Sequence, residues 1–81
     1  MDLRQLEIFT TACEKGSLSS AAACLNTSQP NVSKNIRALE EELGRPLLVR
    51  SGKGVRPTAY GRAVMEYAVI MRKAAEKIAS L

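Results

Sequence analysis

Apolar residues recur at helical spacing through the first half of the chain. From Leu3 to Glu14 they fall three and four positions apart, which predicts an amphipathic helix. Gly16 is expected to end this helix, because glycine readily adopts the left-handed conformation that closes a helix. Ser17 is then a suitable N-cap for a second, shorter helix. The apolar stripe of that second helix is Leu18, Ala21, Ala22 and Leu25.

A third helix is predicted from Gln29 to Leu43, after a turn at Asn26 and Thr27. Ser28 can cap its start, and Pro30 falls in the first helical turn, where the missing N–H of proline is harmless. One face of this helix is apolar and the other is polar. The apolar positions are Val32, Ile36, Leu39 and Leu43, and the polar positions are Gln29, Asn31, Ser33, Lys34 and Arg37.

A small β-hairpin is predicted after the third helix. Leu47 to Arg50 and Val55 to Pro57 are short apolar runs on either side of a glycine-rich turn. Pro57 is expected to keep the second strand short, because proline has no N–H for the hydrogen-bond ladder. Thr58 can then cap a fourth helix that runs to the end of the chain.

The fourth helix has the strictest apolar pattern in the chain. Its apolar positions step by four and three over three heptads: Tyr60, Val64, Tyr67, Met71, Ala74, Ile78 and Leu81. Such a seam is typical of a helix that packs lengthwise against another helix, most simply its counterpart in a second subunit. The small Ala74 keeps open the alternative that the seam packs only on its own domain.

The net charge of the chain lies in its middle. The formal net charge is +4, from 12 Lys and Arg against 8 Asp and Glu. Between Gln29 and Arg62 seven basic residues face three acidic ones, while the charges of the other residues cancel. The basic residues are Lys34, Arg37, Arg45, Arg50, Lys53, Arg56 and Arg62. This distribution favours a surface that binds a polyanion, although scattered basic residues can also form an ordinary solvated surface.

Length and composition restrict the classes to which the chain can belong. With 81 residues it can form one compact domain, and its hydrophobic fraction of 46% is too high for a disordered chain. No apolar run is long enough for a membrane-spanning helix, and the residues after Met1 do not resemble a signal peptide. Two cysteines without an export signal point to reduced thiols in the cytoplasm.

The residue types needed for catalysis or metal binding are poorly represented. The chain has no histidine, which removes the commonest general base and the commonest metal ligand. Cys13 and Cys24 are interpreted as small core residues rather than as a redox or metal pair. The consecutive Glu40, Glu41 and Glu42 point in different directions on a helix, which indicates a solvated helix end rather than paired carboxylates. We therefore expect no enzyme activity, no cofactor and no metal.

The second and third helices have the arrangement of a helix-turn-helix. With the hairpin they predict a mainly α fold: a winged helix-turn-helix of three helices and a β-hairpin wing, followed by a long C-terminal dimerisation helix. In this motif the N-terminal residues of the second helix contact base edges in the major groove of double-stranded DNA. The candidate base-reading residues are Gln29, Pro30, Asn31, Ser33 and Lys34.

Two alternatives remain open at this point. The first concerns Ser19 and Ser20, which are candidates either for capping the second helix or for contacting phosphate. The second concerns the function of the whole chain, which can also be read as a helical protein–protein interaction module with an incidental basic face. A steep salt dependence of binding would favour DNA binding over the interaction module, because it shows that basic residues neutralise phosphates.

Four stretches of the chain resemble the N-terminal domain of LysR-type transcriptional regulators. They are Gly16 to Ala22, Ser28 to Gly44, Pro46 to Arg50 and Thr58 to Gly61. The resemblance implies a cytoplasmic, nucleoid-associated bacterial regulator that binds palindromic promoter sites as a homodimer, with a tetramer conceivable at full length. It implies a winged helix-turn-helix in residues 1–57 and a dimerisation linker helix in residues 58–81. The effector-binding domain, through which such a regulator takes a small-molecule effector, is expected to be absent from this chain.

The same resemblance assigns roles to residues by position. Those expected near phosphates are Thr27, Ser28 and Arg37, and those expected to act from the wing are Arg50 and Lys53. Three positions depart from the family's pattern. One is Pro57, which replaces a common leucine before the last helix. Lys34 stands where arginine is more common, so the planar bidentate contact of arginine with guanine is not expected. Asn31 replaces a residue that is commonly small and apolar, and can add a polar contact.

Overall fold

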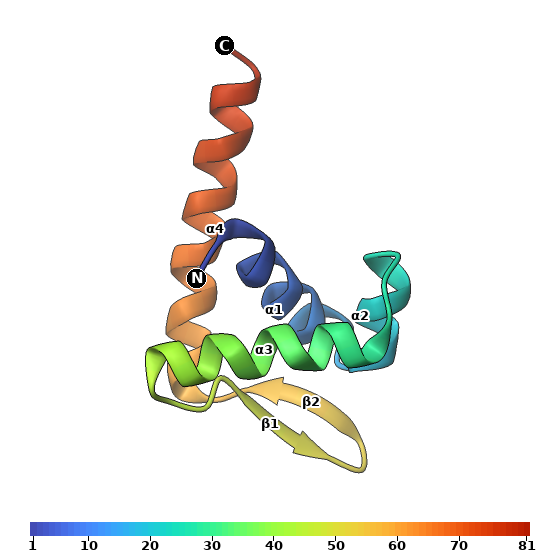
Figure 1. The fold of residues 1–81 in the computed structure, drawn as a ribbon. Helices are drawn as coiled ribbons and strands as arrows, with labels where there is room; N and C mark the ends of the chain where they lie inside the picture. Colours follow the sequence, from blue (N-terminus) through green and yellow to red (C-terminus); the bar gives the residue numbers. More distant parts are fainter.

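The computed structural model describes residues 1–81 as four helices and one two-stranded antiparallel hairpin (Figure 1). The elements are α1 (Leu3–Lys15), α2 (Leu18–Cys24), α3 (Gln29–Leu43), β1 (Leu48–Ser51), β2 (Gly54–Pro57) and α4 (Ala59–Ala79). The predicted order and number of elements are confirmed, and α3 has the predicted bounds. The first helix is one residue longer than predicted, β1 begins and ends one residue later, and β2 begins one residue earlier.

Local capping signals define the starts of the helices. The side chains of Ser17, Ser28 and Thr58 each accept a hydrogen bond from the backbone N–H three residues later, as expected for N-caps. Asp2 caps α1 in the same way, which the sequence pattern had not indicated. Gly16 and Gly44 end α1 and α3 in the left-handed conformation, with φ of 70° and 75°.

The hydrophobic core lies between α1, α2 and α3, and is closed by the start of the hairpin and one side of α4. Its buried side chains are Leu6, Ile8, Phe9, Ala12, Ala21, Ala22, Val32, Ile36, Leu39, Leu47, Leu48 and Ala68. The small Ala21 and Ala22 allow α2 to approach its neighbours closely. Burial of a large apolar side chain such as Phe9 stabilises the fold by about 1.5–3 kcal/mol. This core fixes which face of α3 remains outside.

The hairpin is attached to the turn between α1 and α2. The backbone N–H of Val55 donates to the carbonyl oxygen of Gly16 at 3.0 Å. Gly54 adopts a φ of 118°, and a Cβ atom there would overlap the same carbonyl oxygen. Only glycine therefore fits at this position without moving the wing. Within the hairpin Leu48 pairs with Pro57 and Arg50 with Val55, so Pro57 is the last paired residue of β2.

Glu40 has a structural role that corrects the sequence interpretation. Its carboxylate accepts hydrogen bonds from the backbone N–H groups of Leu47 and Leu48, at 2.7 Å and 3.4 Å, and is half-buried. Glu40 is therefore not part of a solvated helix end, whereas Glu41 and Glu42 are exposed. The interpretation failed because the partners lie seven and eight residues away, beyond the reach of helical spacing.

The two cysteines differ in their surroundings. Cys13 is half-buried and packs against the core, whereas Cys24 is exposed, so the prediction that both are core residues is wrong for Cys24. The reason is helical geometry, because Ala21 and Ala22 define the buried side of α2 and Cys24 lies outside that arc. Burial, and secondarily the charge of Glu14, raise the pKa of the Cys13 thiol from 9.0 to about 11.

Helix α4 extends well beyond the rest of the domain (Figure 1). Its first half packs on the core through the buried Ala68 and the half-buried Tyr60, Val64 and Met65. Beyond Val69 every residue is exposed, and the helix forms a stalk that contributes to a longest dimension of 43 Å. Gly61 lies where a Cβ atom would overlap the carbonyl oxygen of Leu47, so α4 can start close to the hairpin.

Candidate nucleic-acid interface

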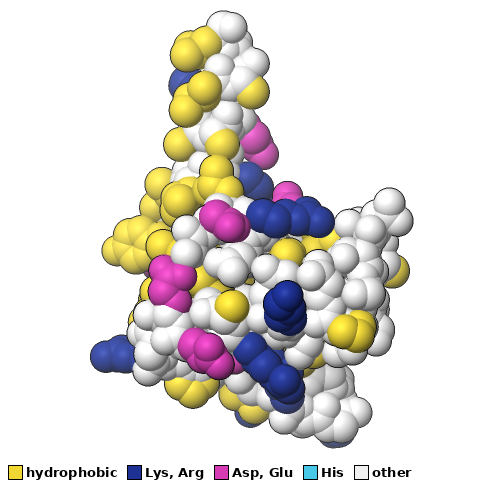
Figure 2. Space-filling model, viewed as in Figure 1, with side chains coloured by type: hydrophobic (Ala, Val, Ile, Leu, Met, Phe, Trp, Pro, Cys, Tyr) yellow, Lys and Arg dark blue, Asp and Glu magenta, His cyan; other side chains and the backbone are white.

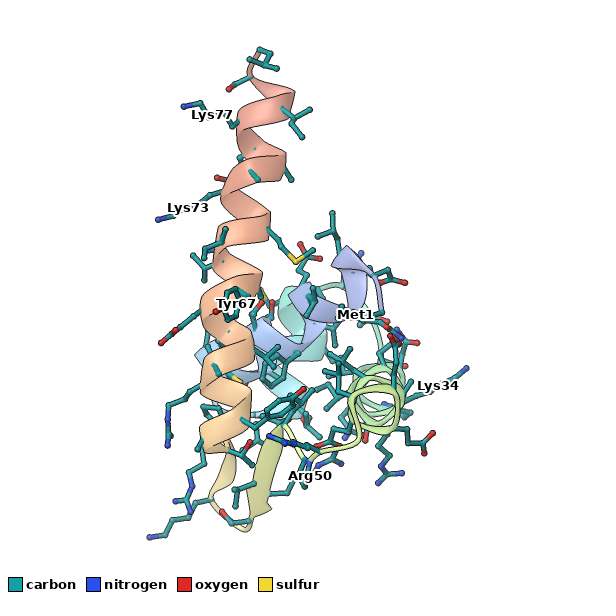
Figure 3. All side chains as sticks on the ribbon, turned by 90° about the vertical axis from the view of Figure 1, so that its left-hand side faces the viewer. Met1, Lys34, Arg50, Tyr67, Lys73 and Lys77 are labelled. Carbon is teal, nitrogen blue, oxygen red and sulfur yellow. The ribbon has the colours of Figure 1, made fainter.

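The outward face of α3 carries the predicted base-reading residues. Val32 and Ile36 point into the core with no exposed surface, and this fixes the rotation of the helix. The residues on its other side therefore face solvent. Of the predicted set, Gln29, Pro30, Asn31 and Lys34 are exposed and Ser33 is half-buried. Figure 3 shows Lys34 projecting from α3 on the side away from α4.

The start of α3 is held in a defined conformation. The hydroxyl of Ser28 accepts from the backbone N–H of Asn31 at 3.2 Å, and Asn26 turns the chain with a φ of 55°. Thr27 accepts from the side-chain amide of Asn31 at 3.0 Å. Backbone N–H groups at a helix start that lack helical partners, together with the helix dipole, favour a nearby anion such as phosphate.

The wing lies directly beside α3. A guanidinium N–H of Arg50 donates to the hydroxyl of Ser33 at 3.2 Å, which joins two predicted site residues that are 17 positions apart. Figure 3 shows Arg50 at the base of the domain, below α3, which is seen there along its axis. Lys53 lies exposed in the hairpin turn, where its backbone N–H donates to Ser51 at 3.3 Å. The structure thus places helix and wing on one continuous surface.

The basic residues of this surface have no acidic partners. The ion pairs in the structure join the N-terminus with Glu42, Arg4 with Glu7, and Arg72 with Glu14. None involves a basic residue between Gln29 and Arg62, and the exposed basic residues there include Lys34, Arg37, Arg50, Lys53 and Arg56. Figure 2 shows Lys and Arg side chains over the middle of α3, while hydrophobic side chains run along α4. Positive charge is therefore available to an anionic ligand.

The side chains of Ser19 and Ser20 are exposed and take no part in the cap of α2. Ser17 is the cap residue, and Ser20 only donates its backbone N–H to it at 3.2 Å. The capping alternative for these two residues is therefore wrong, and their hydroxyls face solvent. A role in contacting phosphate remains a prediction.

A second feature is the apolar face of α4. We call this the α4 apolar face, and its exposed members are Tyr67, Ile70, Met71, Ile78 and Leu81. Tyr67, Ile70 and Ile78 retain 68%, 60% and 70% of their surface, respectively, and the predicted Ala74 is also exposed. Ile70 was missed because it lies outside the strict seam, although it follows Tyr67 by three positions.

The first two residues of the predicted seam have partners within the domain. Tyr60 and Val64 are half-buried against the core, and the guanidinium of Arg45 lies 5.1 Å from the centre of the Tyr60 ring. Such a distance permits a cation–π interaction. The seam therefore divides into a part that packs on its own domain and a longer part without a partner.

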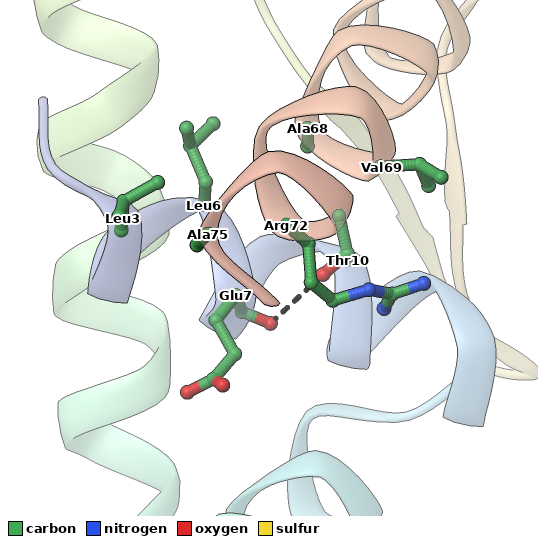
Figure 4. A pocket seen from close by; sticks show the side chains of 8 residues that line it. All are labelled: Leu3, Leu6, Glu7, Thr10, Ala68, Val69, Arg72 and Ala75. Atoms are coloured by element: carbon green, nitrogen blue, oxygen red, sulfur yellow. Dashed lines mark hydrogen bonds between the residues drawn. The ribbon is translucent and has the colours of Figure 1, made fainter. Parts of the chain in front are cut away.

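Two shallow grooves flank α4 near its middle. One is entirely apolar and continues the α4 apolar face onto the body of the domain, lined by Met1, Leu6, Leu43, Val64, Tyr67, Ala68 and Met71. The other lies between α1 and α4, with Arg72 and Glu7 at its polar rim (Figure 4). Neither contains a set of acid, base or nucleophilic groups, and the structure has no cluster of three potential metal ligands. None of its helices is both long enough and apolar enough to cross a membrane.

Comparison with known proteins identifies the family. Residues 3–62 match the family described as "Bacterial regulatory helix-turn-helix protein, lysR family". The chain belongs to the LysR family. It is the DNA-binding domain of a LysR-type transcriptional regulator, and the prediction that it is not an enzyme is confirmed because this family consists of regulators.

Characterised relatives of this LysR domain are much longer than the chain. It is 51% identical over 61 residues to the transcriptional regulator AbaB of Streptomyces antibioticus, covering 75% of the chain and 20% of AbaB. It is 46% identical over 67 residues to the regulator CzcR of Bacillus cereus, covering 83% of the chain and 23% of CzcR. The chain thus spans about a fifth of the length of these relatives.

Solved structures confirm the fold of the LysR domain. The DNA-binding domain of CbnR in complex with DNA matches with a TM-score of 0.94 and 38% identity, over 99% of this chain and 92% of that one. Full-length CbnR bound to its target DNA matches with a TM-score of 0.93, over 99% of this chain and 28% of that one. The BenM DNA-binding domain in complex with catB site 1 DNA matches with a TM-score of 0.94 and 36% identity, over 99% of this chain and 89% of that one. The predicted winged helix-turn-helix with a long C-terminal helix is therefore correct.

Proposed function

We propose that this LysR domain binds double-stranded promoter DNA sequence-specifically as a homodimer, at an imperfect palindromic site. The observation that carries the proposal is the continuous surface of α3 and the wing, which is joined by the Arg50–Ser33 hydrogen bond and whose basic residues form no ion pairs. The DNA complexes of CbnR and BenM, which share the fold, support it.

Two kinds of contact are proposed for this surface. The residues at the start of α3, Gln29, Pro30, Asn31, Ser33 and Lys34, contact base edges in the major groove. Thr27, Ser28 and Arg37 contact phosphates, as do Arg50 and Lys53 from the wing. The assignment to base edges follows the motif, in which the N-terminal residues of the second helix read bases. The assignment to phosphates follows the resemblance to the family, and such contacts fix the position of the protein on DNA whatever the sequence.

The homodimer is proposed to form through α4. The exposed α4 apolar face supports this, because large apolar surfaces on a small domain are stabilised when a partner covers them. The proposed interface comprises Tyr60, Val64, Tyr67, Met71, Ala74, Ile78 and Leu81, with Ile70 added from the structure. A two-fold dimer would present two copies of α3 to two half-sites, which explains a palindromic target.

The proposal extends to a full-length regulator of the length of the LysR relatives, in which this chain is the DNA-binding domain. Residues 1–57 are the DNA-reading unit, and residues 58–81 are the linker and dimerisation helix. An effector-binding domain connected through that helix would take a small molecule in the bacterial cytoplasm, and the full-length protein could assemble further into a tetramer.

Selection of bound duplexes from a random library tests the proposal. We expect the chain to enrich a common motif with two related halves, and to bind the enriched duplex more tightly than a scrambled duplex of the same length. Specific binding typically exceeds non-specific binding by about a thousandfold or more. Equal affinity for both duplexes would overturn the proposal and leave the protein–protein interaction module as the better description.

A further inference from the structure

Three polar side chains form a hydrogen-bonded stripe at the start of α3. The side-chain amide of Asn31 donates to the Thr27 hydroxyl at 3.0 Å, and that of Asn35 donates to the side-chain oxygen of Asn31 at 3.2 Å. The Asn35 amide also donates to the backbone oxygen of Asn31 at 2.8 Å. Residues four positions apart lie on the same side of a helix, so the stripe runs along one flank of α3. The Asn31 carboxamide is therefore held at both its nitrogen and its oxygen.

The hydrogen-bonding capacity that remains on Asn31 has a definite pattern. A carboxamide has two N–H donors and an oxygen with two lone pairs. Thr27 uses one donor and Asn35 uses one lone pair, so one donor and one acceptor remain on the carboxamide. Asn31 is exposed, whereas Thr27 and Asn35 are half-buried. The free donor and acceptor are thus accessible to a ligand at the surface.

This remaining pattern matches only one base edge in the major groove. Adenine presents an acceptor at N7 beside a donor at its N6 amino group, so it can satisfy both free groups of Asn31. Guanine and thymine present only acceptors there, and cytosine presents only its N4 amino donor. A phosphate also accepts only, and would leave the Asn31 oxygen without a donor. An unpaired polar group in a desolvated interface costs about 1–3 kcal/mol, equivalent to about 5- to 150-fold in affinity.

We propose that Asn31 is a specificity-determining residue that recognises an adenine, and that Thr27 and Asn35 are positioning residues that fix its carboxamide. The inference rests on the proposed function, because it requires that α3 enters the major groove. Fixing the carboxamide before binding reduces the side-chain entropy lost on binding DNA. The Thr27 hydroxyl hydrogen is not used in accepting from Asn31, so Thr27 keeps a donor for phosphate.

Duplex selection with matched variants of the 81-residue chain tests this assignment. The set comprises the unaltered chain, Asn31→Ala, Asn35→Ala, Thr27→Val and Thr27→Ser. Thr27→Val keeps the shape of the side chain and removes the acceptor, whereas Thr27→Ser keeps the hydroxyl. Circular dichroism and thermal unfolding of each variant establish that it is folded.

The duplexes selected by the unaltered chain are expected to share an adenine at one position, and those selected by Asn31→Ala are not. Preference for that base should fall by about 5- to 150-fold in Asn31→Ala. It should fall by about 2- to 10-fold in Asn35→Ala and Thr27→Val, as expected for loss of a single orienting hydrogen bond, and should be retained in Thr27→Ser. The readout is the ratio of affinities for two duplexes that differ at that base pair.

Two results would overturn the assignment. One is an unchanged motif after Asn31→Ala, and the other is a uniform loss of affinity for all sequences in Asn35→Ala and Thr27→Val with the base preference intact. Failure of the proposed function is distinguishable, because the unaltered chain would then enrich no motif at all.

Discussion

The side chains of Ser33 and Arg50 meet although they belong to different elements and are 17 positions apart in the sequence. The sequence indicates each of them as a candidate DNA contact, from the polar face of a helix and from the basic hairpin. It cannot indicate that they touch, because their distance depends on how the hairpin folds against α3. The same holds for Glu40 and the backbone of Leu47. The stripe of Thr27, Asn31 and Asn35 differs, because its members are four positions apart and their proximity follows from helical spacing.

Replacement of Gln29 or Arg50 should affect DNA binding in different ways. Gln29→Ala should lose discrimination at particular base pairs, by about 1–3 kcal/mol if the contact is bidentate. Arg50→Ala should weaken binding to all sequences by a similar factor, because it removes the proposed phosphate contact and leaves Ser33 without its partner. The measurement is the affinity for the selected duplex and for single-base variants of it. If both variants lower all affinities equally, the division between base reading and phosphate binding is wrong.

The two cysteines should react with thiol reagents at very different rates. Burial favours the neutral thiol of Cys13 and raises its pKa from 9.0 to about 11. At neutral pH Cys13 therefore has about a hundredfold less of the reactive thiolate than a cysteine with the ordinary pKa. Cys13 labelling should therefore become appreciable only as the pH rises toward 11, while the exposed Cys24 reacts readily. Labelling of Cys24→Ala and Cys13→Ala across this pH range separates the two thiols. Equal rates at pH 8 would contradict the difference in burial.

At the scale of elements, the helices were predictable because their signals are local. Ser17, Ser28 and Thr58 cap helices in the structure as their sequence context predicts, and Gly16 and Gly44 close two of them. The hairpin was less well predicted, since β1 is displaced by one residue and β2 is one residue longer than predicted. Its position is set by the contact of Gly54 and Val55 with Gly16, which lies 38 and 39 positions earlier in the sequence. A contact between residues so far apart cannot be found from the spacing of apolar residues.

The contact between the wing and Gly16 provides a prediction at this scale. Gly54→Ala should destabilise the domain by about 1–3 kcal/mol, because alanine is strained at a φ of 118° and its Cβ atom would displace the Gly16 carbonyl. The wing should move, and affinity for DNA should fall with it. Urea-induced unfolding gives the change in the free energy of unfolding.

Gly52→Ala is a matched control in the same hairpin turn. Nothing lies within 4 Å of a Cβ atom at Gly52, and its φ is outside the left-handed region, so its effect should stay within about 0.5 kcal/mol. Equal destabilisation by the two substitutions would show that the wing is not anchored through Gly54.

The whole molecule consists of a compact head and a projecting apolar helix. The sequence predicted the seam on α4, but the division between its packed beginning and its exposed remainder depends on where α4 leaves the core. Ala68 is the last buried residue of that helix, and the exposed apolar residues continue from there to Leu81. A monomer would leave this surface in water, which is why we expect the chain to pair.

The Met71→Glu variant should convert the dimer to monomers. It places a charge in the α4 apolar face, while Met71 is 41% exposed within its own domain and contributes little to the core. Sedimentation equilibrium should show the change in mass, and circular dichroism should remain that of a folded helical protein. Affinity for the palindromic duplex should fall, because only one half-site can then be held by each molecule.

Ser80→Glu is a suitable control for Met71→Glu. It adds the same charge at the C-cap of α4, nine residues later, which at about 100° per residue points away from the side of Met71. The control should remain dimeric and bind DNA normally. A monomeric unaltered chain, or equal dissociation by both substitutions, would contradict the proposed interface.

The salt dependence of binding to the selected duplex tests the central claim most directly. Each phosphate neutralised by the basic surface should contribute roughly −0.9 to the slope of log affinity against log salt concentration. We predict a steep negative slope for the unaltered chain, a slope smaller by about 0.9 for Arg50→Ala, and a preference over the scrambled duplex that persists at every salt concentration. A flat slope with equal affinity for the two duplexes would contradict the account.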